Sequence, residues 1–189
     1  MKNTKILFAT GNQGKIDEAK AMLGVSLEIA NIQIDEVQSM DLEYVARKKA
    51  QAAFDVLKKP VITDDVGLFI DAWKGFPGPF AKFVLETMGV DGLLDLLKNE
   101  TNRKVIVKSG VAYHDGENIH YFEGEVQGSL ATEQRGIEGF GFDPIIIPDR
   151  ETQTYAEMGI EGKNRISHRR RALDKLKVYL DSQVGQKEI

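Results

Sequence analysis

The N-terminal end of the chain shows a short apolar run followed by a helical repeat of apolar positions. Residues 6–9 are continuously apolar, as expected for a strand that is buried on both faces. A polar stretch follows, and apolar side chains then recur at Ile16, Ala19, Met22 and Leu23, which is the spacing of one helix face. The pattern predicts a buried strand, a glycine-bearing loop and a helix, in that order.

The rest of the chain continues this alternation of strands and helices. Further helices are predicted at 42–57, from Pro79 to about Met88, at 92–98, and from near Ser167 onward. Further strands are predicted at 27–34, 61–63, 105–113, 119–126 and 145–147, with a hairpin around Asp115 and Gly116. Because strands and helices alternate early and a hairpin follows, we expect an α/β fold with a mixed sheet rather than a purely parallel one.

Length, charge and cysteine content narrow the class of protein. The 189 residues suffice for a single domain, which can have two lobes. The chain has no cysteine, which excludes disulfides, thiolate metal sites and a cysteine nucleophile. A formal net charge of -4 argues against broad binding to nucleic acid. No long apolar segment or signal peptide is legible, so we expect a cytoplasmic protein without membrane association.

The polar loop after the first strand is a candidate anion site. Thr10, Gly11, Asn12 and Gly14 break the apolar periodicity, and Lys15 follows at the start of the helix. A helix N-terminus presents free N–H groups and a positive dipole end, which together with a lysine suit a phosphate group. The spacing is neither that of a Walker A loop nor G-x-G-x-x-G. The alternative is that glycine and asparagine serve the turn geometry alone.

Two aspartates, Asp64 and Asp65, follow the strand predicted at 61–63. Adjacent side chains of a strand point to opposite faces, so we expect different roles for the two carboxylates. One would face a cleft as a metal ligand or base, and the other would be held by a cation or by the backbone. Carboxylates at strand ends are suited to Mg²⁺ in α/β proteins. The alternative is an ordinary aspartate turn at the end of a strand.

Two lysines stand out by their positions on the predicted helices. Lys49 falls on the same stripe as Val45 and Ala46. Because this stripe faces the core, the lysine must either extend its ammonium group to solvent or meet an anion. Lys82 lies one turn into the helix that follows a segment rich in glycine and proline, where a surface position is the default.

The start of the last predicted helix is unusually basic. Ser167 is an N-cap candidate, and His168 and Arg169 are followed by two more arginines. Cations at a helix N-terminus oppose the macrodipole, so an anion or an electron-rich group is expected to compensate for them. The alternatives are a solvated basic turn and a patch that binds nucleic acid.

A glycine-rich turn carries two aromatic residues, Phe140 and Phe142, on either side of Gly141. They could stack a nucleotide base, but positions in the core of an incoming strand are the simpler interpretation of these residues alone. The histidines show neither zinc-ligand spacing nor a legible Ser-His-Asp arrangement.

Five segments taken together make the chain resemble one family. They are Thr10-Gly-Asn-Gln-Gly-Lys15, Thr63-Asp-Asp-Val-Gly-Leu68, Gly75-Phe-Pro-Gly-Pro-Phe80, Gly139-Phe-Gly-Phe-Asp-Pro144 and Lys163-Asn-Arg-Ile-Ser-His-Arg169. In this order and at these spacings, over nearly the whole chain, they resemble the inosine triphosphate pyrophosphatase family, the house-cleaning XTP/dITP diphosphatases. The resemblance implies an elongated α/β fold with two lobes around a long mixed sheet, a cleft between the lobes, and a homodimer. It also implies Mg²⁺-dependent hydrolysis of ITP, dITP and XTP to the monophosphate and pyrophosphate.

The resemblance implies roles for particular residues. Asp65 is implied as the base that activates water, with Lys49 beside it, and Glu36 and Asp65 are implied as ligands of one or more Mg²⁺ ions. The residues implied to hold the rest of the substrate are Thr10, Gly11, Asn12, Gln13, Gly14, Lys15, Val66, Lys82, Phe140, Gly141, Phe142, Asp143, Lys163, Ser167, His168 and Arg169. In the base pocket, Lys163, Arg169 and a cationic His168 would donate hydrogen bonds to the 6-oxo group, whereas adenine presents a donor amine there.

The sequence departs from the family pattern at one position and leaves two other functions open. Val66 stands where the family often has serine or threonine, so a hydroxyl contact to the substrate is not expected. One alternative is a pyrophosphatase for dTTP, UTP or modified pyrimidines, as in the Maf-like proteins. The other is a module that binds nucleotide or nucleic acid without turnover. The Ser-His-Arg helix start and the Phe-Gly-Phe-Asp turn argue against the first alternative, and the acidic balance and the intact carboxylates argue against the second.

Overall fold

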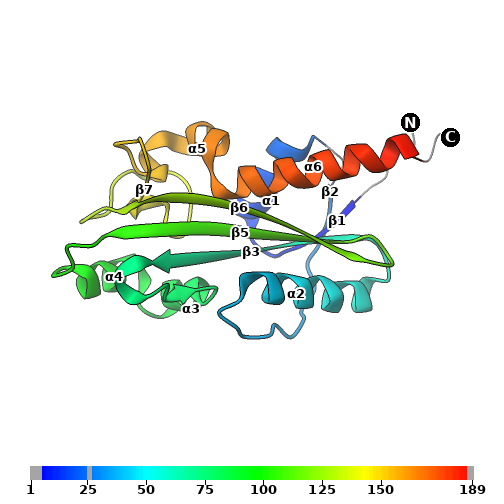
Figure 1. Ribbon diagram of the computed structural model, residues 1–189, viewed down its shortest axis with the longest axis horizontal. Helices are drawn as coiled ribbons and strands as arrows, with labels where there is room; N and C mark the ends of the chain where they lie inside the picture. The colour runs from blue at the N-terminus through cyan, green and yellow to red at the C-terminus, as the bar shows by residue number, and fades with distance from the viewer. Residues whose placement is uncertain (1–5, 25–26, 187–189) are drawn as a thin grey trace.

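The protein is built on one long mixed sheet with helices on both of its faces (Figure 1). The computed structural model describes residues 6–24 and 27–186, and residues 1–5, 25–26 and 187–189 lie outside this part. The strands are β1 (Ile6–Ala9), β2 (Leu27–Ala30), β3 (Val61–Ile70), β4 (Pro77–Gly78), β5 (Lys104–His114), β6 (Ile119–Leu130) and β7 (Ile146–Pro148). The helices are α1 (Gln13–Leu23), α2 (Leu42–Leu57), α3 (Ala81–Thr87), α4 (Gly89–Leu97), α5 (Tyr155–Ile166) and α6 (His168–Gln186), with short 3-10 helices η1 (Asp71–Trp73) and η2 (Asp143–Ile145).

The predicted mixed α/β fold is confirmed by the strand directions. The order across the sheet is β2-β1-β3-β5-β6-β7, with β4 pairing to β3. Strand β1 runs parallel to β2 and β3, whereas β3, β5, β6 and β7 pair in the antiparallel sense. In Figure 1, α1 and α6 cover one face of the sheet and α2 covers the other. Among the described residues, no helix combines the length and the apolar composition that crossing a membrane requires.

Strand β3 changes neighbours along one of its edges. Its start pairs with β1 through Val61 and Ile62, and its end pairs with β4 through Leu68 and Phe69. On the other edge, all of β3 pairs with β5. On the first edge, between the part that pairs with β1 and the part that pairs with β4, residues 63–67 have no strand beside them within the described part of the chain. We call this stretch the edge gap, and it lies directly beyond the carboxyl end of β1.

The length of β3 corrects the strand predicted at 61–63. The strand continues to Ile70, so Asp64 and Asp65 lie inside a strand and not after its end. Aspartate and glycine are unfavourable in strands, which is why the sequence pattern predicted a stop. The ladder with β5 carries the strand through these residues, because pairing on one complete edge compensates for poor local propensity.

Other boundaries differ by smaller amounts. The strand predicted at 27–34 ends at Ala30, and both hairpin strands extend beyond their predicted ends. The strand predicted at 145–147 occupies 146–148, after η2. The helix at 42–57 is confirmed. The helix predicted from Pro79 begins at Ala81 with Phe80 as its N-cap, so the proline precedes the helix and does not lie in its first turn.

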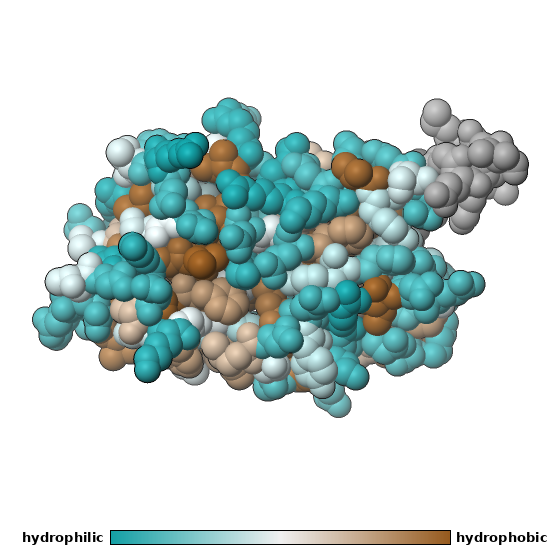
Figure 2. Space-filling view, in the orientation of Figure 1, coloured by the Kyte–Doolittle hydropathy of each residue, from teal (hydrophilic) through white to brown (hydrophobic). Residues whose placement is uncertain are grey.

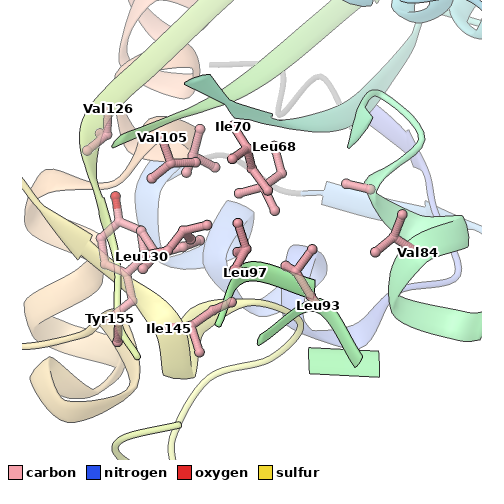
Figure 3. Packing of buried hydrophobic residues seen from close by; sticks show 14 residues of the cluster. Leu68, Ile70, Val84, Leu93, Leu97, Val105, Val126, Leu130, Ile145 and Tyr155 are labelled. Atoms are coloured by element: carbon pink, nitrogen blue, oxygen red, sulfur yellow. The ribbon is translucent and has the colours of Figure 1, made fainter. Parts of the chain in front are cut away.

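Two apolar clusters are buried against the same face of β3. The first joins Leu68 of β3 to Leu93 of α4, and Figure 3 shows these side chains pointing toward one another. The second joins Ile62 of β3 to Leu173 of α6. Because alternate residues of a strand share a face, Asp64 points to the same side as Ile62 and Leu68 and lies between the two clusters. A buried carboxylate therefore separates two apolar regions of the core.

Candidate active site

A cleft of about 990 Å³ opens along the edge gap, between the loop after β1, helix α2, helix α3, the turn before η2 and the start of α6. The predicted site residues that line it are Thr10, Gly11, Asn12, Lys15, Glu36, Lys49, Asp65, Val66, Lys82, Phe140, Gly141, Phe142, Asp143, Lys163, His168 and Arg169. Segments that are far apart in the sequence thus meet at one place. Gln13, Gly14 and Ser167 are not among the residues that line the cleft.

The loop after β1 forms a capped helix N-terminus in the wall of the cleft. The side chain of Asn12 accepts a hydrogen bond from the Lys15 amide at 3.0 Å, and the Asn12 amide donates to the Thr10 hydroxyl at 3.1 Å. This cap starts α1 at Gln13, whose own side chain donates to Asp17 on the exposed side of the helix. The positive end of the α1 dipole therefore faces the cleft, as a phosphate site requires.

At the edge gap, the side chain of Lys15 forms a hydrogen bond to the main chain of β3, as a neighbouring strand would do elsewhere. Its Nζ donates to the main-chain carbonyl of Asp64 at 2.7 Å and lies 3.3 Å from Oδ2 of the same residue. Burial lowers the pKa of Lys15, although the charge of Asp64 acts in the opposite direction. A carbonyl that no strand reaches is thereby satisfied by an ammonium group at the floor of the cleft.

Lys49 bridges two carboxylates in the middle of the cleft. Its Nζ lies 2.8 Å from Oδ1 of Asp65 and 2.9 Å from Oε1 of Glu36. Burial acts to lower the pKa of Lys49, but the two carboxylates outweigh it and raise the pKa. The same ammonium group lowers the pKa of Glu36 against the effect of burial. Of the two interpretations left open for Lys49, the structure selects the one in which the lysine meets an anion.

Glu36 and Asp65 are suited to Mg²⁺ by their chemistry. Oδ2 of Asp65 is buried and has no hydrogen-bond partner among the described residues, so one oxygen remains free for a ligand. In the described part of the chain, no group of three or more histidine, aspartate or glutamate side chains could hold a metal by itself. Mg²⁺ commonly binds through one or two carboxylates, water and substrate phosphates, so this pair fits an ion that arrives with a nucleotide.

The turn before η2 and helix α5 place a lysine against an aromatic ring in the wall of the cleft. Nζ of Lys163 lies 2.7 Å from Oδ2 of Asp143, 2.7 Å from Oε1 of Glu18, and 4.3 Å from the ring centre of Phe140. Burial raises the pKa of Asp143 despite the nearby charge of Lys163. Phe142 lines the cleft but also packs against the first apolar cluster. The two phenylalanines therefore differ, because only Phe140 lies beside the buried charges.

Gly14 lets the ring of Phe140 approach α1. A Cβ atom at Gly14 would lie 2.4 Å from ring atoms of Phe140, so a larger residue would displace that ring. The loop predicted for phosphate and the turn predicted for the base are thus in direct contact. Gly14 contributes to the cleft by this packing.

Arg169 is almost fully buried and held by two carboxylates. Its Nε lies 2.8 Å from Oδ2 of Asp64, and its Nη1 pairs with Glu18. Burial acts to raise the pKa of Asp64, but Arg169 and Lys15 outweigh it and hold the pKa well below its usual range. The two adjacent aspartates have different surroundings, as expected, since Asp64 is held by cations and Asp65 faces the cleft.

His168 corrects one expectation about the base pocket. Burial, followed by the charges of Arg169 and Lys163, lowers its pKa well below the ordinary value. The expectation that His168 is cationic is therefore wrong for the free protein near neutral pH. The neutral ring can donate a hydrogen bond from only one nitrogen. Its Nδ1 is buried without a partner among the described residues. Ser167 is buried and accepts a hydrogen bond from the Arg170 amide at 3.1 Å, as a helix cap does.

Lys82 and Val66 lie at less constrained positions. The side chain of Lys82 is 72% exposed, and its nearest carboxylate is Glu86 at 3.8 Å. The ammonium group therefore stands at the rim of the cleft, free to move toward a ligand. Val66 is half-buried and packs against the first apolar cluster. It contributes an apolar wall at the edge gap.

Glu18 and Ser109 were not singled out from the sequence, although both contact charged side chains in the cleft or directly behind it. Glu18 is 5% exposed and contacts Lys163 and Arg169, and the buried hydroxyl of Ser109 donates to Oδ1 of Asp64 at 2.7 Å. One signal for Glu18 was present, because it lies on the buried face of α1 among Ile16, Ala19 and Met22. Ser109 gave no signal, since a single serine inside a predicted strand does not indicate what its hydroxyl contacts.

Comparisons with known proteins agree on one family. The model of the Ham1 family matches residues 6–179. A dITP/XTP pyrophosphatase of Methanopyrus kandleri is 45% identical over 185 residues, covering 96% of this chain and 98% of that protein. One of Thermococcus kodakarensis is 47% identical over 172 residues, covering 89% of this chain and 93% of that protein. The solved Ham1 protein of Staphylococcus aureus has a TM-score of 0.81 at 30% identity, covering 95% of this chain and 100% of that chain.

Proposed function

The chain belongs to the Ham1 family, and on this basis we propose that it hydrolyses deaminated purine nucleoside triphosphates, such as dITP, XTP and ITP, to the monophosphate and pyrophosphate. The observation that carries the proposal is the set of groups gathered in one cleft. A capped helix N-terminus with Lys15, a cluster of Lys49 with two carboxylates, and buried cations beside Phe140 all meet there. These groups suit a triphosphate, a reacting phosphorus and a base.

The triphosphate is assigned to the part of the cleft formed by the loop after β1. A nucleoside triphosphate carries about four negative charges near neutral pH, because the second pKa of its terminal phosphate is near 6. Thr10, Asn12 and the N-terminus of α1 offer hydrogen bonds, and Lys15, Lys49 and Lys82 offer positive charge. Positioning and charge neutralisation are the main work that a protein does in phosphoryl chemistry.

The hydrolytic step is assigned to the region around Asp65. Asp65 orients a water molecule and accepts its proton while the water oxygen bonds to the α-phosphorus. The bond from the α-phosphorus to its bridging oxygen breaks, and pyrophosphate leaves with that oxygen. We propose that Glu36 and Asp65 hold Mg²⁺, which when bound would neutralise charge on the phosphates. Lys49, now between these carboxylates, is close enough to turn toward the leaving group.

Selection of the base is assigned to the cations around Phe140. A 6-oxo group accepts hydrogen bonds, so it suits Lys163 and Arg169, whereas the 6-amino group of adenine would leave a buried donor unpaired. A site built to make such bonds can reject the wrong base strongly, since unpaired buried polar groups are costly. The 2-amino group of guanine must be excluded by some other contact.

We also propose that the protein acts in the cytoplasm as a homodimer. Support for a second copy comes from exposed apolar side chains outside the cleft, such as Phe76, which is 48% exposed. Figure 2 shows apolar patches over β3 and β5 within a mostly hydrophilic face. Sedimentation equilibrium should give twice the mass of the chain, and a monomer at micromolar concentration would remove this part of the proposal.

The activity is tested by analysing products from ITP, XTP, GTP, ATP and dTTP with Mg²⁺ and with a chelator. The proposal expects the monophosphate and pyrophosphate from ITP and XTP, little from ATP, and no turnover once the metal is removed. Preference for dTTP would instead place the protein among the pyrimidine-directed pyrophosphatases. Binding without release of pyrophosphate from any of them would make it a nucleotide-binding module.

A further inference from the structure

Asp64 lies directly behind the wall of the cleft, because it is 2% exposed and is not itself among the residues that line the cleft. Its carboxylate is nonetheless in contact with two cations that do line it. Oδ2 lies 2.8 Å from Nε of Arg169 and 3.3 Å from Nζ of Lys15. Both cations are long side chains that would otherwise have considerable freedom.

The position of Asp64 is itself fixed at several points. Oδ1 accepts a hydrogen bond from the buried hydroxyl of Ser109 at 2.7 Å, and the main-chain carbonyl of Asp64 accepts one from Lys15 at 2.7 Å. The main chain is held by the ladder with β5, where Asp64 pairs with Val111. A carboxylate on the central strand is therefore a rigid reference point for the two cations.

Arg169 and Lys15 come from the parts of the cleft that we assign to the base and to the triphosphate, and these parts meet at the same carboxylate oxygen of Asp64. Lys15 comes from the start of α1 beside the triphosphate loop, and Arg169 comes from the start of α6 beside Phe140. A second route joins the same two helices, because Glu18 of α1 contacts both Arg169 and Lys163. We define the buried ion network as the cations Lys15, Lys163 and Arg169 and the carboxylates Glu18, Asp64 and Asp143.

We propose that Asp64 is a positioning residue that aligns Lys15 with Arg169, so that recognition of the base contributes to the rate of phosphate hydrolysis. The proposal rests on the proposed function of the cleft. When Arg169 binds the correct base, its anchor on Asp64 keeps Lys15 in register with the triphosphate. Binding energy at the base is then realised in the transition state and raises kcat, because the reacting groups are already oriented.

Because Asp64 is charged, the proposal predicts that its substitution changes kcat and KM in different ways. Asp64→Asn keeps the size of the side chain and an acceptor for Ser109, but it removes the negative charge between two cations. The cleft then becomes more positive, which favours ground-state binding of a polyanion, while the alignment of Lys15 and Arg169 is lost. A change that merely loosened the fold would instead weaken binding.

The experiment compares Asp64→Asn with the unchanged protein, using ITP and ATP as substrates. For ITP we expect kcat to fall on the order of 10–100-fold, as for small misplacements of reacting groups, with KM unchanged or lower. The ratio of kcat/KM for ITP to that for ATP should fall with it, since the adenine base gains less from Arg169. Inhibition by inorganic tripolyphosphate, measured without turnover, should be unchanged or stronger.

Asp115→Asn is the matched control. The carboxylate of Asp115 is also held by hydrogen bonds, from two main-chain amides and with His120 at 2.8 Å, but it lies at the hairpin outside the cleft. Its variant should leave kcat and the ITP/ATP ratio unchanged. If Asp64→Asn does not fold, Ser109→Ala replaces it, because it frees Oδ1 while keeping the charge. In Ser109→Ala we expect kcat and the ITP/ATP ratio to fall together.

Two results would overturn the proposal. The first is a folded Asp64→Asn, or Ser109→Ala in its place, with the kcat and ITP/ATP ratio of the unchanged protein. The second is a raised KM and weaker inhibition by tripolyphosphate at an unchanged ratio, which would indicate a structural role alone. Failure of the proposed function has a separate signature, since the unchanged protein would then not release pyrophosphate from ITP.

Discussion

Asp64 and Asp65 are adjacent in the chain but belong to different surroundings. Their side chains leave β3 on opposite faces, so Asp64 meets Arg169 and Lys15 while Asp65 meets Lys49. Alternation along a strand thus separates a carboxylate that holds cations from one that keeps a free oxygen in the cleft. A helix could not separate two adjacent residues as completely, because its neighbouring side chains diverge by less.

The first prediction concerns the free oxygen of Asp65. Asp65→Asn should lower kcat on the order of 10²–10⁴-fold, because an amide can neither accept the proton of water nor carry the charge that a metal needs. The thermal midpoint should change little, since the side chain keeps its shape. Release of pyrophosphate from ITP and a thermal melt measure the two effects. Normal turnover in this variant would remove Asp65 from the mechanism.

The second prediction compares two lysines of the cleft. Lys49→Met should lower kcat far more than Lys82→Met, because Lys49 is held between Glu36 and Asp65 whereas Lys82 is exposed at the rim. Without Lys49 the two carboxylates face each other with no cation between them. Steady-state rates for both variants at saturating ITP measure the difference. Equal losses would show that the bridge in the free protein has no bearing on turnover.

At the scale of elements, the sequence predicted whether a segment is a helix or a strand better than it predicted where the segment ends. The helix at 42–57 and the hairpin were legible, because periodic apolar positions extend over their length. Strand β3 was cut short at Asp64, since its continuation depends on the ladder with β5 and not on local propensity. Helix α5 gave no clear repeat, because Gly159 adopts φ 70 and ψ 174 and interrupts the helical geometry.

The contacts within the cleft were less predictable than the residues that line it. Motif resemblance indicated most of the lining residues, but it did not indicate that Glu18 joins Lys163 to Arg169. That contact depends on how α1 and α6 pack together, which no local pattern encodes. The protonation of His168 was also missed, because burial is a property of the folded chain and decides its pKa.

The third prediction concerns the contact between α6 and β6. A Cβ atom at Gly124 would lie 2.1 Å from the carbonyl oxygen of His168 and 2.4 Å from the amide nitrogen of Ala172. Gly124→Ala should therefore push α6 away from the sheet and lower the free energy of unfolding by about 1–3 kcal/mol, as overpacking does. Turnover should fall as well, because α6 carries His168 and Arg169.

Urea unfolding and ITP hydrolysis measure these two effects of Gly124→Ala. Gln127→Ala is the control, since Gln127 lies on the same strand with an exposed side chain. It should change the free energy of unfolding by no more than about 0.5 kcal/mol, as is usual at the surface. Equal stability of the two variants would mean that the helix can move without cost.

At the scale of the whole molecule, a titratable side chain at the centre makes stability depend on pH. The buried His168 has a lowered pKa in the folded protein, whereas in the unfolded chain it takes a proton below about pH 6.5. The unfolded state then binds more protons, so stability is full above this pH and falls as the pH drops below it.

The fourth prediction follows from that linkage. In His168→Gln, the free energy of unfolding should fall less between pH 7.5 and pH 5.5 than in the unchanged protein. The expected difference is about 1.4 kcal/mol, because His168 of the unfolded chain binds a proton over about one pH unit below pH 6.5. Denaturant titrations at the two pH values measure it. His114 and His120 are present in both proteins and cancel. An equal difference in both proteins would show that His168 titrates normally when folded.

The whole-molecule expectation of one domain with two lobes over residues 1–189 stays a prediction. The mixed sheet passes continuously from β2 to β7, and the cleft opens where its edge is interrupted. The residues that we propose to bind phosphate and base reach this place from opposite ends of the chain. The arrangement favours a site that exists only when the whole fold is assembled.

That arrangement has a consequence for how the protein is made. Arg169 contacts Glu18 and Asp64 across separations of 151 and 105 residues, so the last helix completes the cleft. A chain emerging from the ribosome carries Glu18 and Asp64 long before the arginine that pairs with them. Until then these carboxylates lack Arg169, and contacts so distant in sequence form slowly. We therefore expect a nascent chain to lack the complete cleft until its synthesis is nearly finished.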